Sequence, residues 1–201
     1  SDLTQAIGKI RINVHEMGID YASCSAHKIY GPKGIGAAYM RSDDYGIQPI
    51  TAFMHGGEQE FGFRAGTLAV HNIVGFGKAA EIALRDFQKN EEELKRLDAL
   101  FVEAICNMPN IRLTIAPEKR APGIISIIVD KKDFNNERFI KAVSDDLALS
   151  TGSACSAGEP SYVISAIGLE DEVSKVMRIS LNKYTTDDDV KRLIQILQSR
   201  V

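Results

Sequence analysis

Cysteine is scarce in this sequence, and its distribution excludes two common kinds of site. Cys24, Cys106 and Cys155 are the three cysteines in 201 residues, and they lie far apart without a CxxC pair. This spacing argues against a zinc cluster or a disulfide framework and favours a reducing compartment. Charge of one sign is also lacking, because the formal net charge is −3 and lysine and arginine are scattered. We therefore expect neither direct nucleic-acid binding nor attraction to an anionic membrane.

Long apolar runs are missing as well. None approaches the ~20 residues of a membrane span, and the first residues do not form a signal peptide. Hydrophobic residues make up 44% of the sequence and charged residues 25%, which is ordinary for a globular protein. We expect a cytoplasmic protein without a membrane segment or a metal site. Its 201 residues suffice for one large domain or two small ones.

Strands and helices alternate along the chain, which is typical of an α/β protein. Short strands are predicted at 21–25 and 35–40, on either side of a glycine-rich turn at 31–34. Apolar residues then recur at helical spacing from 68 to 108. The polar stretch 86–93 interrupts this pattern and predicts a break between two helices. We place the domain boundary there, between 1–88 and 89–201.

The second half predicts a compact α+β unit. Strands are expected at 111–115, 123–129 and 176–181, and helices at 136–147 and 161–167, with a loop of small residues at 151–160. The last helix begins after Thr186 as its cap, with Asp189 three residues later. The first half offers fewer strands than a parallel-sheet domain needs, and the chain opens directly on Ser1. We therefore expect a fragment of a longer protein.

Lys28 is the first candidate for chemistry. It follows Ser25, Ala26 and His27 at the end of a predicted strand and precedes a glycine turn. Reaction with a carbonyl requires a partly neutral amine, and burial or nearby cations can lower the pKa of a lysine to that end. The neighbouring hydroxyl and imidazole could hold a phosphate. Alone the signal is weak, because most lysines beside turns, such as Lys33, are merely solvated.

Cys155 is the second candidate. It lies in Ser150–Gly158, where eight small residues surround one thiol. Such a segment has little to anchor it in a core, so an accessible nucleophile is one reading and a packed small residue is the other. Cys24, within a strand, and Cys106, on an apolar helix, are expected to pack as small hydrophobic residues.

Arg178 is the third candidate, because it stands inside a short apolar strand. Alternation places it with Ser180 on the face opposite Met177 and Ile179. An arginine in that position needs an anionic partner. A substrate carboxylate held in a bidentate manner and a structural Asp or Glu both remain open.

The order of these motifs is more specific than any one of them. Ser-x-His-Lys and Tyr-Gly-Pro-Lys-Gly are followed by His55-Gly56-Gly57, by Gly62-Phe63-Arg64-Ala65-Gly66-Thr67, by Gly-Ser-Ala-Cys and by Arg-Ile-Ser-Leu. This succession resembles the cysteine desulfurases, in the group related to the housekeeping and nitrogen-fixation enzymes. The resemblance covers essentially the whole chain and about the second half of a family member.

The resemblance implies an α/β fold of the pyridoxal-phosphate (PLP) fold type I, which is aspartate aminotransferase-like. Residues 1–88 would be the C-terminal portion of the PLP-binding large domain. Residues 89–201 would be the small domain that carries the catalytic cysteine loop. Family features that precede Asp2, among them an imidazole that stacks on the cofactor and the phosphate loop, are not in this sequence. The isolated chain is therefore expected to bind PLP poorly and to be inactive.

The resemblance also implies roles at the cofactor. Lys28 would bind PLP covalently and move protons at the substrate α-carbon. Asp2 and Gln5 would contact the pyridine nitrogen and the ring hydroxyl oxygen, and a carboxylate there keeps the nitrogen protonated. Ser25 and His27 would bind the phosphate.

Three further residues receive roles at the substrate and the partner subunit. Thr67 would reach the phosphate of the other subunit in a homodimer. It could also merely cap the helix that starts near Leu68, and the two roles are compatible. Arg178 would hold the α-carboxylate of L-cysteine. Cys155 would attack the substrate sulfur, which leaves a persulfide on the enzyme and releases L-alanine. A sulfur-acceptor protein, either an iron–sulfur scaffold or a tRNA-thiolation enzyme, would take the sulfur.

Some positions depart from the family pattern. Glu58 stands where a third glycine is expected, and Phe61 stands where an arginine is expected. By the same resemblance, the loop between Cys155 and Glu159-Pro160 is about two residues shorter than in the most similar group. His15 and His71, on expected helical stretches, receive no role.

Two other functions remain open. The chain could be a relative of the same fold, such as a selenocysteine lyase or a class V aminotransferase, although Cys155 in its small-residue loop argues against the aminotransferase. It could also act as a non-catalytic binding or assembly module, if the gene itself is this short.

Overall fold

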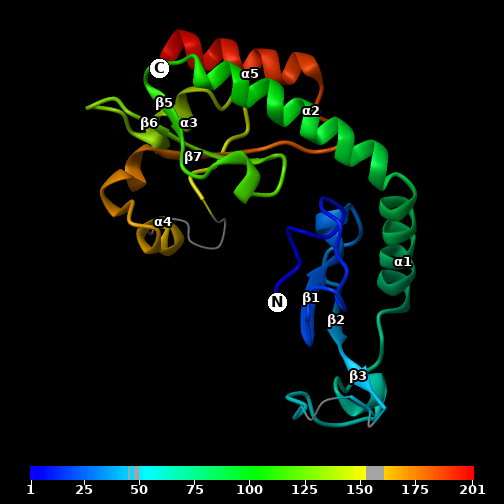
Figure 1. Ribbon diagram of the computed structural model, residues 1–201. Coiled ribbons are helices and arrows are strands. Elements are labelled where there is room, and N and C mark those ends of the chain that lie inside the picture. Colours follow the sequence, from blue (N-terminus) through cyan, green and yellow to red (C-terminus); the bar gives the residue numbers. More distant parts are fainter. Residues whose placement is uncertain (45, 48–49, 153–160) are drawn as a thin grey trace. The chain divides into compact units, whose positions relative to one another are not determined.

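The chain forms two compact units, Ser1–Gln88 and Lys89–Val201. The computed structural model describes residues 1–44, 46–47, 50–152 and 161–201 (Figure 1). Within that part of the chain, no helix combines the length and the apolar character that crossing a membrane requires.

The first unit contains an antiparallel hairpin that carries the Lys28 segment between its strands. Strand β1 (Tyr21–Ser25) pairs with β2 (Gly36–Met40), with Tyr21 opposite Met40 and Ser25 opposite Gly36. The 3₁₀ turn η1 (Ala26–Ile29) begins directly after β1. Both predicted strands are thus present, and the second begins one residue later than expected. A shorter pair, β3 (Ser42–Asp43) and β4 (Gly46–Ile47), follows.

The predicted break in the long helical stretch falls at Asp86. Helix α1 (Val70–Arg85) ends there, and α2 (Phe87–Cys106) begins at the next residue. His71 lies on α1 as expected and is exposed, whereas His15 lies in a turn and not on a helix. Gly18, which has a φ of +65°, is the last residue of that turn. A left-handed glycine ends a helical segment readily, which explains why no helix forms there.

The second unit is built on a three-stranded antiparallel sheet. Its strands are β5 (Ile111–Leu113), β6 (Ile124–Val129) and β7 (Val176–Ser180), in the order β5-β6-β7. Strand β6 is therefore central, and Ser126 lies opposite Arg178 on β7. A 3₁₀ turn, η3 (Pro117–Lys119), lies between β5 and β6.

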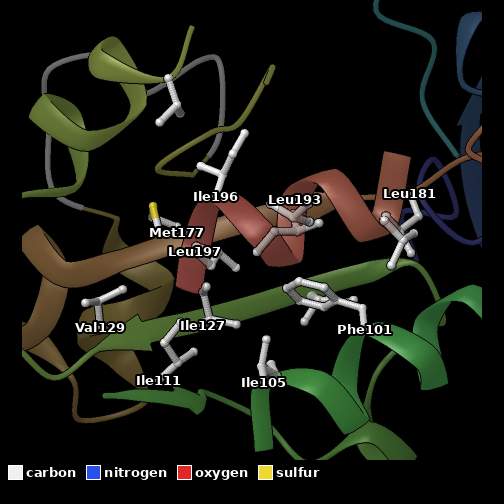
Figure 2. Close-up of a cluster of buried hydrophobic side chains, with 14 of the residues drawn as sticks. Phe101, Ile105, Ile111, Ile127, Val129, Met177, Leu181, Leu193, Ile196 and Leu197 are labelled. Atoms are coloured by element: carbon white, nitrogen blue, oxygen red, sulfur yellow. The ribbon is translucent and has the colours of Figure 1, made fainter. Parts of the chain in front are cut away.

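One hydrophobic core joins this sheet to the helices of the second unit (Figure 2). Alternate residues of β6 enter it, namely Ile125, Ile127 and Val129, as the period of two along a strand requires. Helix α2 and the last helix, α5 (Asp187–Arg200), contribute at helical spacing. Their buried residues are Leu94, Leu97, Phe101 and Ile105 on α2, and Val190, Leu193, Ile196 and Leu197 on α5.

The remaining helices are short. Helix α3 (Asn136–Ala142) ends five residues before the predicted limit, because Val143 leaves the helical conformation and the chain turns at 143–146. Helix α4 (Tyr162–Ala166) is capped by Ser161, and the 3₁₀ turn η5 (Glu170–Lys175) leads into β7.

The predicted cap of the last helix is present. The Thr186 hydroxyl accepts a hydrogen bond from the backbone N–H of Asp189, and the Asp189 carboxylate accepts one from the backbone N–H of Thr186. The backbone N–H and then the hydroxyl of Thr186 donate to the Asp189 carboxylate and hold the pKa of Asp189 below its ordinary value. The cap thus satisfies backbone donors that the helix itself leaves unpaired.

We expect Thr186→Ala to lower the free energy of unfolding by about 1 kcal/mol, because the hydroxyl that caps α5 is lost. Urea denaturation followed by circular dichroism measures the change. Thr186→Ser is the matched control, since it keeps a hydroxyl at the same position and is expected to retain most of the stability. Equal losses in both variants would contradict the role of the cap.

Candidate functional site

The turn η1 presents Lys28 to solvent. Ala26 and Ile29 are almost completely buried, whereas His27 and Lys28 between them are exposed. A 3₁₀ turn repeats every three residues, so Ala26 and Ile29 share one face and the two polar residues face away from it. Ser25, the last residue of β1, is half-buried. The local fold thus supplies a lysine, an imidazole and a hydroxyl within four residues.

Backbone hydrogen bonds close this turn tightly. The N–H of Gly31 donates to the carbonyl of Ala26 at 2.9 Å, and the N–H of Tyr30 donates to the carbonyl of His27. Tyr30 has a φ of 67°, in the left-handed region that bulky residues rarely occupy. Such a conformation persists only where the surroundings impose it, so the turn after Lys28 is held in one shape.

Small residues bring α1 close to the Lys28 turn. A Cβ atom added to Gly31 would lie 3.1 Å from the Cβ of Ala79, and one added to Gly75 would lie 2.6 Å from Cγ of Pro32. Ala79 is itself buried. The close packing of the turn on α1 therefore requires glycine at 31 in the turn and at 75 in the helix, where larger side chains would overlap their neighbours.

Asp2 and Gln5 lie at the start of the chain, beside β1. The backbone around Asp2 pairs in parallel with Ser23, through hydrogen bonds from Leu3 N–H to the Ser23 carbonyl and from Ser23 N–H to the Ser1 carbonyl. The Thr4 side chain and then its backbone N–H donate to the Asp2 carboxylate, which lowers the pKa of this exposed group. Asp2 is consequently an anion at neutral pH. The Gln5 carbonyl oxygen accepts from the Lys9 ammonium at 2.7 Å.

Thr67 is exposed and does not cap α1. The residue that precedes the helix is Ala69, and the helix begins at Val70. The capping alternative is therefore wrong, because the helix starts two residues later than the hydrophobic pattern indicated. Gly66, with a φ of +104°, accepts from Arg64 through its carbonyl and donates from its N–H to the Gln59 side chain.

The two departures in this segment have different structural consequences. Glu58 has a φ of −87°, which any residue adopts, so nothing in its backbone requires the expected glycine. Phe61, in the 3₁₀ turn η2 (Gln59–Gly62), has a φ of 56° and a side chain that is 93% exposed. A bulky residue in the left-handed region is strained. Nothing among the described residues of the first unit accounts for an aromatic side chain at this position.

Arg178 occupies the predicted position on β7, opposite the hydrophobic core. Met177 and Ile179 enter the core, and Arg178 between them lies on the other face and is half-buried. Its Nε atom is buried and has no hydrogen-bond partner among the described residues. A buried donor without a partner costs free energy.

Ser150, the first residue of the small-residue segment that carries Cys155, pairs with Arg178 through its backbone. The two residues exchange both backbone hydrogen bonds, from Arg178 N–H to the Ser150 carbonyl and from Ser150 N–H to the Arg178 carbonyl. The Ser150 hydroxyl also donates to the Gly152 carbonyl and accepts from the Gly152 N–H. Nothing in the composition of this small-residue run indicated which of its residues anchors it. Only the register with β7 identifies Ser150.

Cys155 lies outside the described residues, as does most of the predicted loop 151–160. The residues on either side of the undescribed segment are close together, because a Cβ atom added to Gly152 would lie 3.9 Å from the Cβ of Ser161. Of the other thiols, Cys24 is half-buried but Cys106 is exposed. The expectation that Cys106 packs in the core is wrong, because it lies at the last residue of α2, beyond the buried Ile105.

Residues 1–193 match the model of the aminotransferase class-V family. The chain belongs to this family. Its whole length also matches the curated cysteine desulfurase IscS of Methylococcus capsulatus at 39% identity and the mitochondrial cysteine desulfurase of Saccharomyces cerevisiae at 37% identity. The chain spans 49% and 40% of these two relatives. The resemblance to the cysteine desulfurases that the motifs indicated is thus confirmed.

Solved structures confirm the predicted fold of this class-V aminotransferase family member. A NifS-like protein aligns with a TM-score of 0.84 at 30% identity, over 98% of this chain and 50% of that one. A NifS-like protein from Rickettsia africae aligns with a TM-score of 0.83 at 28% identity, over 99% and 52%. The mixed α/β fold is therefore part of the PLP fold type I, as expected.

The close packing behind Lys28 gives a test with an internal control. Gly75→Ala is expected to lower the free energy of unfolding by roughly 1–3 kcal/mol, because the new methyl group overlaps Pro32. Gly77→Ala, on the same helix, meets nothing within 4 Å. It should stabilise the protein by about 0.5–1 kcal/mol, as alanine does in a helix interior. Urea denaturation measures both, and a stabilised Gly75→Ala variant would exclude the tight contact.

Proposed function

We propose that this protein is a PLP-dependent cysteine desulfurase, which removes sulfur from L-cysteine, releases L-alanine and holds the sulfur as a persulfide on Cys155. The observation that carries the proposal is the pair of backbone hydrogen bonds between Ser150 and Arg178. This pairing holds Ser150, where the segment that carries Cys155 begins, beside Arg178 on β7. The curated relatives named cysteine desulfurases support it over the entire chain.

The residues around Lys28 have the chemistry that PLP requires. The exposed Lys28 amine can bind the cofactor covalently, and the Asp2 carboxylate, with its lowered pKa, can pair with a protonated ring nitrogen. Gln5 can donate to the ring hydroxyl oxygen, and Ser25 and His27 can donate to the phosphate. Bound PLP supplies an electron sink for the substrate α-carbon. Lys28 removes and returns the protons at that carbon.

Arg178 suits the α-carboxylate of L-cysteine. Its guanidinium can bind a carboxylate in a bidentate manner, and the described residues leave its Nε without a partner. No described Asp or Glu side chain forms an ion pair with Arg178, so its guanidinium is available to the substrate carboxylate. This favours the substrate over the structural partner that the sequence left open.

Chain length alone limits where the Cys155 thiol can be. Cys155 follows Gly152 by three residues in the sequence, and three residues of chain span at most about 11 Å. Gly152 is held to Ser150, and Ser150 to Arg178. A thiol on this tether can approach the sulfur of a substrate whose carboxylate Arg178 binds.

The transfer step balances without an added oxidant. The Cys155 thiolate attacks the substrate sulfur, the S–S bond forms, and the bond between that sulfur and the substrate β-carbon breaks. The electron pair of the broken bond stays with the carbon, which takes up a proton and becomes the methyl group of L-alanine. The terminal sulfur of the persulfide then passes to an acceptor protein, either an iron–sulfur scaffold or a tRNA-thiolation enzyme, and Cys155 returns to its thiolate.

In the full-length enzyme, Cys155→Ser is expected to abolish persulfide formation and L-alanine release, because serine is not deprotonated near neutral pH as cysteine is. PLP should still bind to Lys28, as borohydride reduction and peptide mapping would show. Mass spectrometry after a single turnover locates the persulfide. Cys106→Ser is the necessary control because Cys106 is exposed, and it should retain activity and change stability by less than about 0.5 kcal/mol. Persulfide on Cys106 or Cys24 would disprove the assignment.

We also propose that the active enzyme is a homodimer in which Thr67 binds the phosphate of the partner's cofactor. The exposure of Thr67, which leaves its hydroxyl accessible to a partner, supports this. Lys28→Ala and Thr67→Val subunits should complement one another when mixed, since one site of each mixed dimer keeps both residues. Desulfurase activity at limiting PLP should then exceed the sum for the separate variants. An activity that merely equals this sum would exclude a shared site.

A further inference from the structure

Ser126 is the polar exception in strand β6. The strand reads Ile124, Ile125, Ser126, Ile127, Ile128 and Val129, so one hydroxyl interrupts five aliphatic residues. The flanking Ile125 and Ile127 belong to the core, and Ser126 between them therefore lies on the opposite face of the sheet. This is the face on which Arg178 lies.

The register brings Ser126 and Arg178 directly opposite each other. Arg178 exchanges both of its backbone hydrogen bonds with Ser150, and the Ser126 carbonyl accepts from the Thr114 N–H on the other side. Ser126 and Arg178 therefore form a non-hydrogen-bonded antiparallel pair. In such pairs the Cα atoms are only about 4.5 Å apart and the side chains are closest.

Nε of Arg178 needs a hydrogen-bond acceptor, and a bound carboxylate does not have to supply it. A bidentate carboxylate can take the two terminal nitrogens of a guanidinium, which leaves Nε to be satisfied by the protein. That Nε is buried and has no partner in the described part of the chain. A hydroxyl within reach of it would remove the cost of the unpaired donor and fix the plane of the guanidinium.

The two other hydroxyls on the neighbouring segments, those of Ser150 and Thr114, already form hydrogen bonds. Ser150 donates to the Gly152 carbonyl and accepts from the Gly152 N–H. Thr114 donates to the Ser126 carbonyl, and it is one strand further from Arg178. The described residues show no hydrogen bond of the Ser126 hydroxyl. Of the three cross-strand hydroxyls, Ser126 is thus the one left to serve Arg178.

The Ser126 hydroxyl is not hydrogen-bonded to Nε of Arg178 in this structure. We propose that Ser126 is a positioning residue for the substrate carboxylate: when the carboxylate binds, the Ser126 hydroxyl turns to accept from Nε of Arg178 and orients the guanidinium. This inference rests on the proposed desulfurase function, because it takes Arg178 as the group that binds the α-carboxylate. Ser126 itself does not touch the substrate. Its loss changes substrate binding and leaves the chemical step intact.

The test compares Ser126→Val with Ser126→Thr in the complete, cofactor-loaded enzyme. Valine removes the hydroxyl and keeps a shape suited to a strand, whereas threonine has nearly the same shape and restores the hydroxyl. Ser126→Val should raise the KM for L-cysteine about tenfold, as the loss of a hydrogen bond to a charged group does, and should change kcat less than about twofold. Ser126→Thr should stay near the parent enzyme.

Ser180→Val is the matched control, because Ser180 lies on the same face of β7, is exposed and pairs with Ile124. Its KM should be that of the parent. A double-mutant cycle with Arg178→Lys decides whether Ser126 acts through Nε, which lysine lacks. In that background Ser126→Val should raise KM further by less than about twofold. An unchanged KM in Ser126→Val, or a tenfold rise that persists in the Arg178→Lys background, would overturn the inference.

Binding of L-alanine, followed by isothermal titration calorimetry, separates this inference from the proposed function. The dissociation constant for L-alanine depends on the carboxylate contact and not on sulfur transfer. If the parent enzyme forms no persulfide but Ser126→Val weakens L-alanine binding about tenfold, the positioning role stands and the desulfurase function fails. If persulfide forms normally and L-alanine binds equally to both proteins, the desulfurase function stands and the positioning role is wrong.

Discussion

Backbone pairing on both edges of β7 is the constraint on which the second unit depends. One edge pairs with β6 and places Ile179 and Met177 in the core, and the other edge pairs with Ser150. Because successive side chains of a strand point to opposite faces, the same pairing that buries these residues sets Arg178 on the other face. The face on which Arg178 lies thus follows from core packing, and a shift of one residue in register would place it on the core face instead.

Close approach between backbone and helix has a similar role in the first unit. The Lys28 turn is short, and it is held by the buried Ala26 and Ile29 on one side and by its left-handed closure at Tyr30. Glycines at 31 and 75 allow α1 to pack against this turn. Such rigid support suits the catalytic role that we propose for Lys28, because small misplacements of a catalytic group are costly. Neither feature involves a polar interaction with Lys28 itself.

Salt bridges contribute locally but do not determine these sites. Asp98 and Arg120 form a bidentate pair with side chains only 9% exposed, and Asp98 also accepts from the Gly123 N–H. This pair joins α2 to the turn before β6. Removing one partner would leave a buried charge, which is strongly destabilising, although the pair itself need not add stability. The network of Arg96 with Glu93 and Asp187 lies at the surface and is screened by salt.

Local pattern determined most of the elements. The strand at 21–25, the break at Asp86 and the capping box of Thr186 with Asp189 were all predictable, because each depends on neighbours within a few residues. The lengths of α3 and α1 were less predictable, since the ends of helices depend on tertiary contacts as well as on propensity. The burial of Cys106 was misjudged for a related reason. Its neighbour Ile105 enters the core, but Cys106 is one residue further around the helix and faces the solvent.

The sequence by itself indicated the chemistry that we propose for this protein. Lys28, Asp2, Cys155 and Arg178 are recognisable from the order of short motifs, because each motif is contiguous in the chain. Only the tertiary structure decided which residues support them. Ser126 and Ser150 are 52 and 28 residues from Arg178 in the sequence, yet both are its cross-strand neighbours. Strand register arises from the burial of a whole face of the sheet, and no single stretch of sequence contains that information.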